Sequence, residues 1–234
     1  MKALVIGGSG TIGTAIVRQL LNDGYEVIVH YHSANIDDLV TTFEGEAVTF
    51  VQADLSASSL DVSRFDWIQN LDCLIYVAGQ AVYGQLQDMT ESDMDATYYV
   101  HVKNLIVLCQ YFVDQLRQRP HGRIIVISSI WGETGASMET IYSSMKAAQL
   151  GFVRALSKEL AQTTVTVNAI TPGFVAGRMA EKWSEDELKD MLTELPQQRL
   201  IQPEEIAHAC AHLYHPMSQS ITGAVQRING GWYV

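Results

Sequence analysis

Apolar runs rich in β-branched residues alternate with stretches of helical periodicity along the whole chain of 234 residues. Several apolar runs are continuous, which is typical of strands covered on both faces. Strands are predicted at residues 2–6, 26–31, 47–52, 72–77, 123–128, 164–170 and 224–228. Helices are predicted near residues 12–22, 35–43, 91–118, 140–161 and 203–214. This alternation predicts an α/β fold with a doubly wound, mostly parallel seven-stranded sheet, helices on both faces and right-handed crossovers.

No linker, internal repeat or low-complexity segment interrupts this pattern, so we predict a single domain over residues 1–234. The net charge of −11 argues against nonspecific binding to nucleic acid or to an anionic membrane, because both reward basic surface. No apolar run is long enough to span a bilayer, and the N-terminus is too short for a signal peptide. Three widely spaced cysteines, Cys73, Cys109 and Cys210, are expected to be core residues in a reducing cytoplasm.

A glycine-rich turn, "LVIGGSGTIG", joins the first predicted strand to the first predicted helix. Gly8, Gly10 and Gly13 form a GxGxxG pattern, and Gly7 with the latter two forms GxxGxxG. Such a turn lets backbone amides and a helix N-terminus approach a pyrophosphate. With a strand before it and a helix after it, the turn favours a Rossmann-type dinucleotide site over a purely structural one.

The end of the second strand indicates which dinucleotide is bound. A site for NAD carries an acidic residue about 20 residues after the glycines, where it holds the ribose hydroxyls. Here the segment is "VIVHYHSAN", and the nearest acids, Asp37 and Asp38, fall in the next predicted helix. No carboxylate would repel a 2′-phosphate, so NADPH is predicted, although His30, His32 and Ser33 stand there in place of an arginine.

Ser129, Tyr142 and Lys146 carry the candidate chemistry. Ser129 follows the fifth strand, and the other two residues lie four apart on one face of the next helix. A tyrosine is a poor acid–base group at neutral pH unless a cation stabilises its phenolate, and Lys146 can supply that cation. Ser129 can donate a hydrogen bond to the reacting oxygen of a ketone. The set therefore predicts an oxidoreductase that reduces a carbonyl group.

These features together resemble the short-chain dehydrogenase/reductase family, and within it the 3-oxoacyl-acyl carrier protein reductases. The resemblance includes "GGSGTIG", "ADLS", "ISS", "YSSMK", "VNAITPG", "RLIQPEEIA" and "ITGAVQRINGGWYV" and covers nearly the whole chain. It implies that Tyr142 is the general acid, that Ser129 polarises the carbonyl, and that Lys146 binds the nicotinamide ribose. It also implies a homotetramer with one interface formed by the helices at 91–118 and 140–161.

The resemblance and the strand ends together predict the residues that contact the cofactor. Asp54, in "QADLS", could receive the adenine amino group or could cap the following turn. The predicted cofactor contacts are Gly7, Ser9, Gly10, Thr11, Ile12, Gly13, His32, Asp54, Leu55, Ala78, Gly79, Tyr142, Lys146, Pro172, Gly173 and Val175.

The chain departs from the family at several positions of the expected site. Tyr76 and Val77 replace two asparagines, which removes a side chain that usually helps to fix the fourth strand. His101 stands where the family carries a catalytic asparagine, and it could hold a proton relay or be a hydrogen-bonded core histidine. The middle glycine of the family's turn falls at Thr11, and a threonine that usually contacts the cofactor amide falls at Gly177.

The segment "IWGETGASMET" between Ser129 and Tyr142 is expected to line the substrate side, together with a small helical insertion near 176–197 that contains the charged run 181–190. Trp131 offers an apolar wall, while Glu133 and Glu139 would favour a cationic substrate. Parts of this segment and the "NGGWY" ending resemble reductases of a 5-aminopentanone group on elongation factor P, which is the alternative to a 3-oxoacyl group on an acyl carrier protein.

Two further alternatives concern other classes of protein. The departures at Tyr76, Val77 and His101 could belong to a non-catalytic NADP-binding sensor, although such a protein would not need the Ser–Tyr–Lys set. Three histidines near the C-terminus share no acidic or cysteine partner at a metal-binding spacing, so no metal site is predicted. They are His208, His212 and His215.

Overall fold

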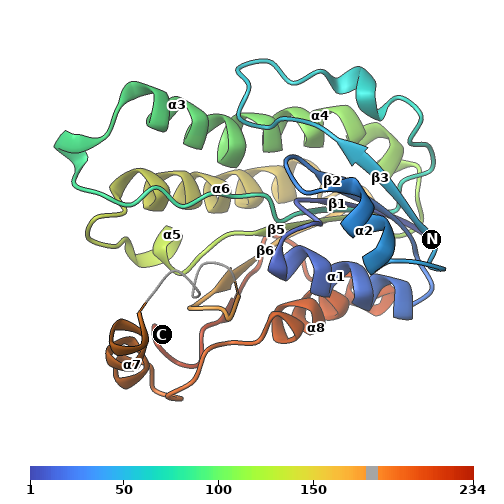
Figure 1. Cartoon of the computed structure of the whole chain (residues 1–234). Helices are drawn as coiled ribbons and strands as arrows, with labels where there is room; N and C mark the ends of the chain where they lie inside the picture. Colours follow the sequence, from blue (N-terminus) through green and yellow to red (C-terminus); the bar gives the residue numbers. More distant parts are fainter. Residues whose placement is uncertain (178–183) are drawn as a thin grey trace.

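The protein, in a computed structural model that describes residues 1–177 and 184–234, is built on one seven-stranded parallel sheet (Figure 1). The strand order is β3-β2-β1-β4-β5-β6-β7, and every neighbouring pair is parallel. The strands are β1 (Lys2–Ile6), β2 (Glu26–Tyr31), β3 (Val48–Gln52), β4 (Cys73–Tyr76), β5 (Arg123–Ile127), β6 (Thr166–Pro172) and β7 (Val225–Ile228). The predicted doubly wound sheet is confirmed, and the order reverses between β1 and β4, where ligands bind in sheets of this type.

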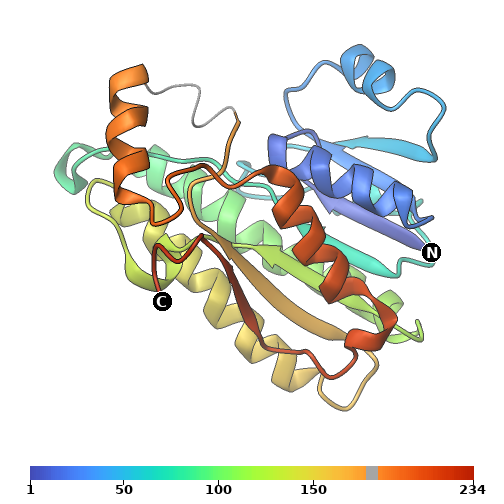
Figure 2. The same ribbon diagram turned by 90° about the horizontal axis from the view of Figure 1, so that it is seen from below.

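Helices cover both faces of this sheet (Figures 1 and 2). On one face, α1 and α8 pack against the strands through side chains such as Ile16 and Ile206, which are fully buried. On the other face, α4 and α6 bury Phe112 and Val153 against the sheet. The helices are α1 (Thr11–Asn22), α2 (Ile36–Thr42), α3 (Glu91–Tyr98), α4 (Asn104–Arg117), α5 (Trp131–Thr134), α6 (Thr140–Glu159), α7 (Glu185–Glu194) and α8 (Pro203–Tyr214).

The predicted helix at 91–118 is divided into α3 and α4 by a π-helical turn, Tyr99–Lys103. Two backbone carbonyls of this turn accept hydrogen bonds from side chains outside the helix. The Tyr76 hydroxyl donates to the Val100 carbonyl, and Gln149 Nε2 donates to the His101 carbonyl at 2.8 Å. Such π-turns are common at functional sites. Apolar periodicity continues through the turn, which explains why the sequence predicts one helix.

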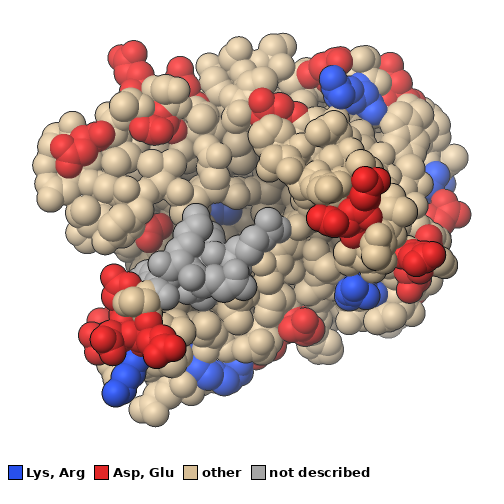
Figure 3. All heavy atoms as spheres, viewed as in Figure 1, with Lys and Arg blue, Asp and Glu red and all other residues tan. Residues whose placement is uncertain are grey.

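The predicted helical insertion near 176–197 contains α7, which begins with a capping box between Ser184 and Glu187. Its acidic side chains gather at one edge of the molecule (Figure 3). Residues 178–183 of the predicted insertion, which include the first residues of the charged run 181–190, lie outside the described residues. Among the described residues, no helix is both long enough and apolar enough to cross a bilayer.

The three cysteines are free and buried, with Cys73 and Cys210 among the residues of one core cluster and Cys109 in the other. This placement confirms the expectation that they act as small apolar core residues.

Candidate active site

Ser129, Tyr142 and Lys146 come together at the carboxyl edge of the sheet. Ser129 lies just beyond β5, and α6 presents Tyr142 and Lys146 one turn apart. The Ser129 and Tyr142 side chains are hydrogen bonded to each other. Lys146 Nζ donates to the Ile127 carbonyl at 2.9 Å and lies 5.6 Å from the centroid of the Tyr142 ring. The three side chains expose 8%, 9% and 3% of their surfaces, so they form one buried polar cluster.

Burial controls the protonation of this cluster. It raises the pKa of Tyr142 to about 12, against the lowering effect of the hydrogen bond with Ser129, and the charge of Glu139 raises that pKa further. Burial also lowers the pKa of Lys146 to about 7. At neutral pH Tyr142 therefore carries its proton and can act as a donor, while Lys146 lies near the midpoint of its titration.

His101 packs edge-on against Tyr142, with ring centroids 5.5 Å apart. Its Nε2 atom lies 3.1 Å from the amide nitrogen of Gln80 and 2.9 Å from the carbonyl oxygen of the same residue. Its Nδ1 atom is buried and has no hydrogen-bond partner in the part of the chain that the structure describes. Burial lowers the pKa of His101 to about 3, and the charge of Lys146 adds to this effect, so the ring is neutral at physiological pH.

The geometry thus brings His101 to the predicted site and bonds one of its nitrogens to the backbone, as in a core histidine. The ring also shapes the start of the loop after β4, because a Cβ atom at Gly79 would lie 2.8 Å from His101 Cε1. Whether His101 takes part in proton transfer stays a prediction.

The fourth strand is fixed by a contact that the sequence does not predict. Tyr76, at the end of β4, is fully buried, and its hydroxyl donates to the Val100 carbonyl. The side chain of the family's asparagine is absent, as expected, but a tyrosine hydroxyl ties the strand to the π-helical turn instead. Gln149 supplies a second buried tie, from α6 to the His101 carbonyl. Neither residue has a local sequence signal, because each partner lies on a distant element.

The glycine turn between β1 and α1 fits a bound pyrophosphate. Gly7 has φ +83°, and a Cβ atom there would lie 2.6 Å from the Ala78 nitrogen. A Cβ atom at Gly13 would lie 2.2 Å from the Gly7 carbonyl oxygen. The close approach of these backbone segments leaves the first-turn amides of α1, from Thr11 to Gly13, facing the carboxyl edge of the sheet. The predicted residues Ser9, Gly10 and Ile12 belong to the same turn.

Two departures from the family meet in space. A Cβ atom at Gly177, which has φ +135°, would lie 2.5 Å from Thr11 Cγ2. The larger residue in the glycine turn therefore packs directly on the smaller residue after β6, and the threonine that the family carries at position 177 would clash with Thr11.

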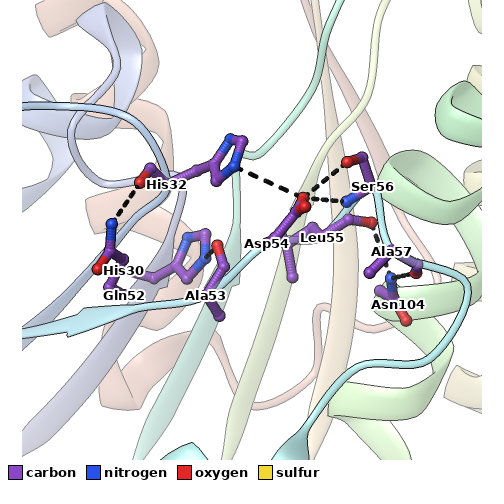
Figure 4. A network of polar contacts seen from close by, with 9 residues as sticks. All are labelled: His30, His32, Gln52, Ala53, Asp54, Leu55, Ser56, Ala57 and Asn104. Atoms are coloured by element: carbon purple, nitrogen blue, oxygen red, sulfur yellow. Dashed lines mark hydrogen bonds and ion pairs between the residues drawn. The ribbon is translucent and has the colours of Figure 1, made fainter.

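The predicted adenine side is a pocket of about 430 Å³ between the ends of β2 and β3. His32 and Asp54 line it, with His32 Nε2 3.7 Å from Asp54 Oδ1 (Figure 4). Asp54 Oδ1 also accepts from both the amide and the hydroxyl of Ser56, which is the capping role that the sequence left open. Arg64 lines the same pocket, and the sequence analysis missed it because it lies ten residues after Asp54.

The remaining predicted cofactor residues also lie at strand ends. Leu55 is a core residue whose carbonyl accepts from Asn104 Nδ2 at 2.8 Å (Figure 4). Ala78 and Gly79 follow β4. Pro172 ends β6, the Gly173 amide donates to the Ile228 carbonyl, and Val175 pairs with Ile201.

The expectation that Glu133 brings negative charge to the substrate side is wrong. Glu133 does not offer a free negative charge, because Arg227 binds its Oε2 atom at 2.6 Å and the Thr171 hydroxyl donates to its Oε1 atom at 2.6 Å. Glu139 differs from it. Its carboxylate is partly buried just before α6, has no hydrogen bond or ion pair among the described residues, and has a pKa raised by burial. The ring of Trp131 packs against the C-terminal residues Trp232 and Tyr233.

Histidines near the C-terminus are not part of a metal cluster in the described ranges 1–177 and 184–234, where no group of three or more potential ligands is found. His215 instead accepts the Met217 amide through its Nδ1 atom.

Comparison with known proteins gives relatives over the whole length of the chain. It is 34% identical to "Uncharacterized oxidoreductase YmfI" of Bacillus subtilis, over 99% of this chain and 98% of that protein. It is 33% identical to an acetoacetyl-CoA reductase of Cupriavidus necator, over 99% and 98% of the two chains. It is 30% identical to the 3-oxoacyl-[acyl-carrier-protein] reductase FabG of Staphylococcus aureus, over 100% and 98%.

Solved structures give the same result. A short-chain dehydrogenase/reductase from Serratia marcescens superposes with a TM-score of 0.90 at 27% identity, over 100% of this chain and 98% of that one. An actinorhodin polyketide ketoreductase solved with NADPH superposes with a TM-score of 0.88 at 25% identity, over 99% and 96%. The sequence model described as short chain dehydrogenase matches residues 1–188. This chain therefore belongs to the short-chain dehydrogenase/reductase family, and it is an oxidoreductase.

Proposed function

We propose that the protein is an NADPH-dependent ketone reductase whose substrate is a 3-oxoacyl group carried on a thioester, with an acyl carrier protein as the carrier. The observation that carries the proposal is the buried cluster in which Tyr142 is hydrogen bonded to Ser129 and stacked beside Lys146, at the same sheet edge as the glycine turn. Relatives named as acetoacetyl-CoA reductase and 3-oxoacyl-acyl carrier protein reductase support this substrate class.

Each side chain of the cluster has a separate role in the proposed reduction. NADPH, when bound, supplies the hydride that reduces the carbonyl carbon. Tyr142 donates its hydroxyl proton to the carbonyl oxygen, which becomes the hydroxyl of the 3-hydroxyacyl product. Ser129 donates a hydrogen bond to the same oxygen and so stabilises the negative charge that develops there. Protonated Lys146 lowers the energy of the Tyr142 phenolate that remains, and its free N–H groups are available for the ribose.

The preference for NADPH rests on the charge near the ends of β2 and β3. His32 and Ser33 line the pocket there, and β2 does not end in an acidic residue that would hold the ribose hydroxyls of NAD. The carboxylates of the pocket are Asp54, 3.7 Å from His32, and Asp61. Arg64 adds a positive charge to the same pocket, although its Nε atom is 3.6 Å from Asp61. We propose the glycine turn, His32, Asp54 and the segments after β4 and β6 as the cofactor-binding residues.

The direct test follows NADPH oxidation by absorbance with a panel of 3-oxoacyl thioesters and small ketones. We expect turnover of the thioesters by the native protein and a loss of about 10³-fold in Tyr142→Phe. A protein that binds NADPH but oxidises it with none of these ketones, and whose Tyr142→Phe variant behaves like the native chain in every assay, would be a nucleotide sensor instead.

A second substrate is favoured by Glu139. Its partly buried carboxylate has no partner among the described residues, and it lies three residues before Tyr142, close enough for its charge to raise that pKa. A negative charge at this place suits a ketone that also bears an amine, such as a 5-aminopentanone group on elongation factor P, better than a neutral acyl chain.

Glu139→Gln separates the two substrates. For an amine-bearing ketone we expect KM to rise about tenfold, since the charge of the site is lost, while KM for a neutral 3-oxoacyl thioester stays the same. Glu133→Gln is the matched control, because that carboxylate is already bound to Arg227 and Thr171. Slower turnover of the amine-bearing ketone than of the thioester, with a KM for that ketone that Glu139→Gln leaves unchanged, would remove the amine-bearing alternative.

Assembly as a homotetramer is also part of the proposal. The outer surface of the α3–α4 segment exposes Tyr98 and Ile106, each by 41%. Large apolar side chains exposed on adjacent helices are typical of a subunit interface. Light scattering of the native protein and of Ile106→Glu measures this directly, and a monomeric native protein would contradict it.

A further inference from the structure

His30 lies at the centre of the proposed cofactor side and is not itself a predicted contact of the cofactor. It belongs to β2 and is 2% exposed. The Gly7 amide donates to its Nδ1 atom at 3.1 Å, and its Nε2 atom lies 3.1 Å from the Ala53 carbonyl oxygen (Figure 4). One ring therefore joins the glycine turn after β1 to the segment after β3 that carries Asp54.

These two contacts assign the proton on the ring. An amide can only donate, so Nδ1 must be the acceptor and Nε2 must carry the hydrogen that is donated to Ala53. The ring has to be neutral for this arrangement. Burial lowers the pKa of His30 to about 4, the bond to Ala53 opposes this effect, and the neighbouring His32 adds to it. Both ring nitrogens are thus fully used at neutral pH.

Gly7 is the residue on which the turn depends. Its carbonyl accepts from the Gly10 amide at 3.1 Å, and Gly13 packs so closely on that carbonyl that only a glycine fits. Gly7 joins the peptide whose amide His30 holds to the peptide whose carbonyl meets Gly10 and Gly13, so its conformation sets the position of the first turn of α1. The Gly7 amide belongs to the Ile6–Gly7 peptide, whose carbonyl accepts from the Val77 and Ala78 amides. His30 holds the other side of this peptide, and without it the partly buried amide would have no acceptor among the described residues.

We propose that His30 is a positioning residue that preorganises the dinucleotide site by holding the Gly7 amide through Nδ1. The bond to Ala53 orients the ring, and the bond to Gly7 aligns the turn before the cofactor arrives. A turn that is already ordered loses less conformational entropy on binding, so the bond increases affinity for the cofactor without touching it. The inference rests on the proposed function only in that the turn binds NADP(H).

Three substitutions of His30 separate the effect of its bond to Gly7 from that of its bond to Ala53. His30→Asn places an oxygen near the position of Nδ1, so it can still accept from Gly7. His30→Gln places its amide near the position of Nε2, so it can still donate to Ala53 but leaves Gly7 without an acceptor. His30→Leu removes both bonds. Ile28→Ala is the control for general damage, since Ile28 is 3% exposed two residues earlier on β2.

The measurement is the dissociation constant for NADPH, from cofactor fluorescence without any ketone, beside kcat at saturating NADPH. We expect the dissociation constant to rise about tenfold in His30→Leu and His30→Gln and less than about threefold in His30→Asn, with kcat unchanged. Urea unfolding of each variant shows that it is folded. In Ile28→Ala we expect lower stability and an unchanged dissociation constant.

Equal affinity in all three His30 variants would overturn the inference, and so would equal losses in His30→Asn, His30→Gln and Ile28→Ala. If the native protein binds NADPH tightly in these experiments, such results leave the proposed function standing. A native protein that binds neither NADPH nor NADH would instead contradict the proposed function, and this inference with it.

Discussion

Two buried cations lie at opposite ends of the sheet and differ in how many hydrogen bonds they make. Arg123, at the start of β5, is 1% exposed, and Lys146, beyond the end of the same strand, is 3% exposed. The Arg123 guanidinium donates to the carbonyls of Gly122, Thr164 and His215 and to the side chain of Gln219. Lys146 donates one hydrogen bond, to Ile127. Neither cation has a carboxylate partner among the ion pairs of the described residues.

The difference distinguishes a cation with a structural role from one with a proposed role in catalysis. Arg123 spreads its charge over several acceptors and joins β5 to the segment after α8. Lys146 keeps two N–H groups without a partner among the described residues, beside Tyr142, and burial lowers its pKa to about 7. A buried amine that is so incompletely satisfied destabilises the fold, and its position beside the proposed acid indicates why it is retained. The same substitution at both ends, to methionine of similar length, tests this comparison.

The largest effect is expected from Lys146→Met. Loss of the cation removes the stabilisation of the Tyr142 phenolate, so kcat/KM for a ketone should fall about 10³-fold, as in Tyr142→Phe. Steady-state kinetics with NADPH measure it, and circular dichroism controls for folding. Because the two residues act as a unit, the double variant should be little slower than either single variant. Losses that multiply in the double variant would show that the two side chains act independently.

The pH dependence of the native protein gives the next largest effect. In the proposed mechanism, reduction requires protonated Lys146 and protonated Tyr142, whose pKa values are about 7 and about 12. The pKa of His101 near 3 keeps that ring neutral. We therefore expect kcat/KM to be constant from pH 5 to 6 and to fall about tenfold per unit above pH 7, as Lys146 loses its proton.

Lys146→Arg is the control for the pH profile, because a guanidinium stays protonated throughout this range. Its activity should be lower, since the geometry changes, but its profile should lose the bend near pH 7. A native profile that stays flat up to pH 9 would contradict the assignment of this titration to Lys146.

The sheet and the proximity of Ser129, Tyr142 and Lys146 could be predicted from the sequence because both depend on local patterns. The buried parallel strands are continuous apolar runs, and their ends were located within one or two residues. Tyr142 and Lys146 lie on one face of α6 because they are four residues apart, and Ser129 joins them because β5 ends beside that helix. The glycine turn was recognisable from its place between a strand and a helix.

Long-range contacts of the site had no such pattern. The Tyr76 hydroxyl reaches a carbonyl 24 residues away, and Gln149 reaches one 48 residues away. The charge of Glu133 was expected in the substrate pocket, but it is neutralised by an arginine 94 residues later. Each of these contacts depends on how elements pack rather than on spacing along the chain.

The same substitution, Lys146→Met, is expected to raise the stability of the fold although it lowers activity. The pKa of Lys146 is lowered from 10.5 in an unfolded chain to about 7, so the unfolded chain binds the proton more tightly. This destabilisation is fully present below pH 7 and disappears as pH rises to 10.5. Lys146→Met should therefore be more stable than the native protein, on the order of 2 kcal/mol at pH 7, with the gain shrinking above that pH. Urea unfolding at pH 7 and pH 9.5 checks it, and an equal gain at both values would point to better packing instead.

The smallest effect is expected from Arg123→Met, although Arg123 makes more hydrogen bonds than Lys146. Each of its three carbonyl acceptors also accepts from a second donor. The Gly122 carbonyl accepts from the Thr166 amide, the His215 carbonyl from the Ser218 amide, and the Thr164 carbonyl from the Gln219 side chain. Methionine thus leaves no backbone carbonyl unpaired and also removes a buried charge, so the two changes nearly cancel. We expect the free energy of unfolding to change by no more than about 1 kcal/mol and kcat/KM to stay the same. A loss above about 3 kcal/mol would show that the charge of Arg123 itself, rather than its volume, holds β5 to the segment after α8.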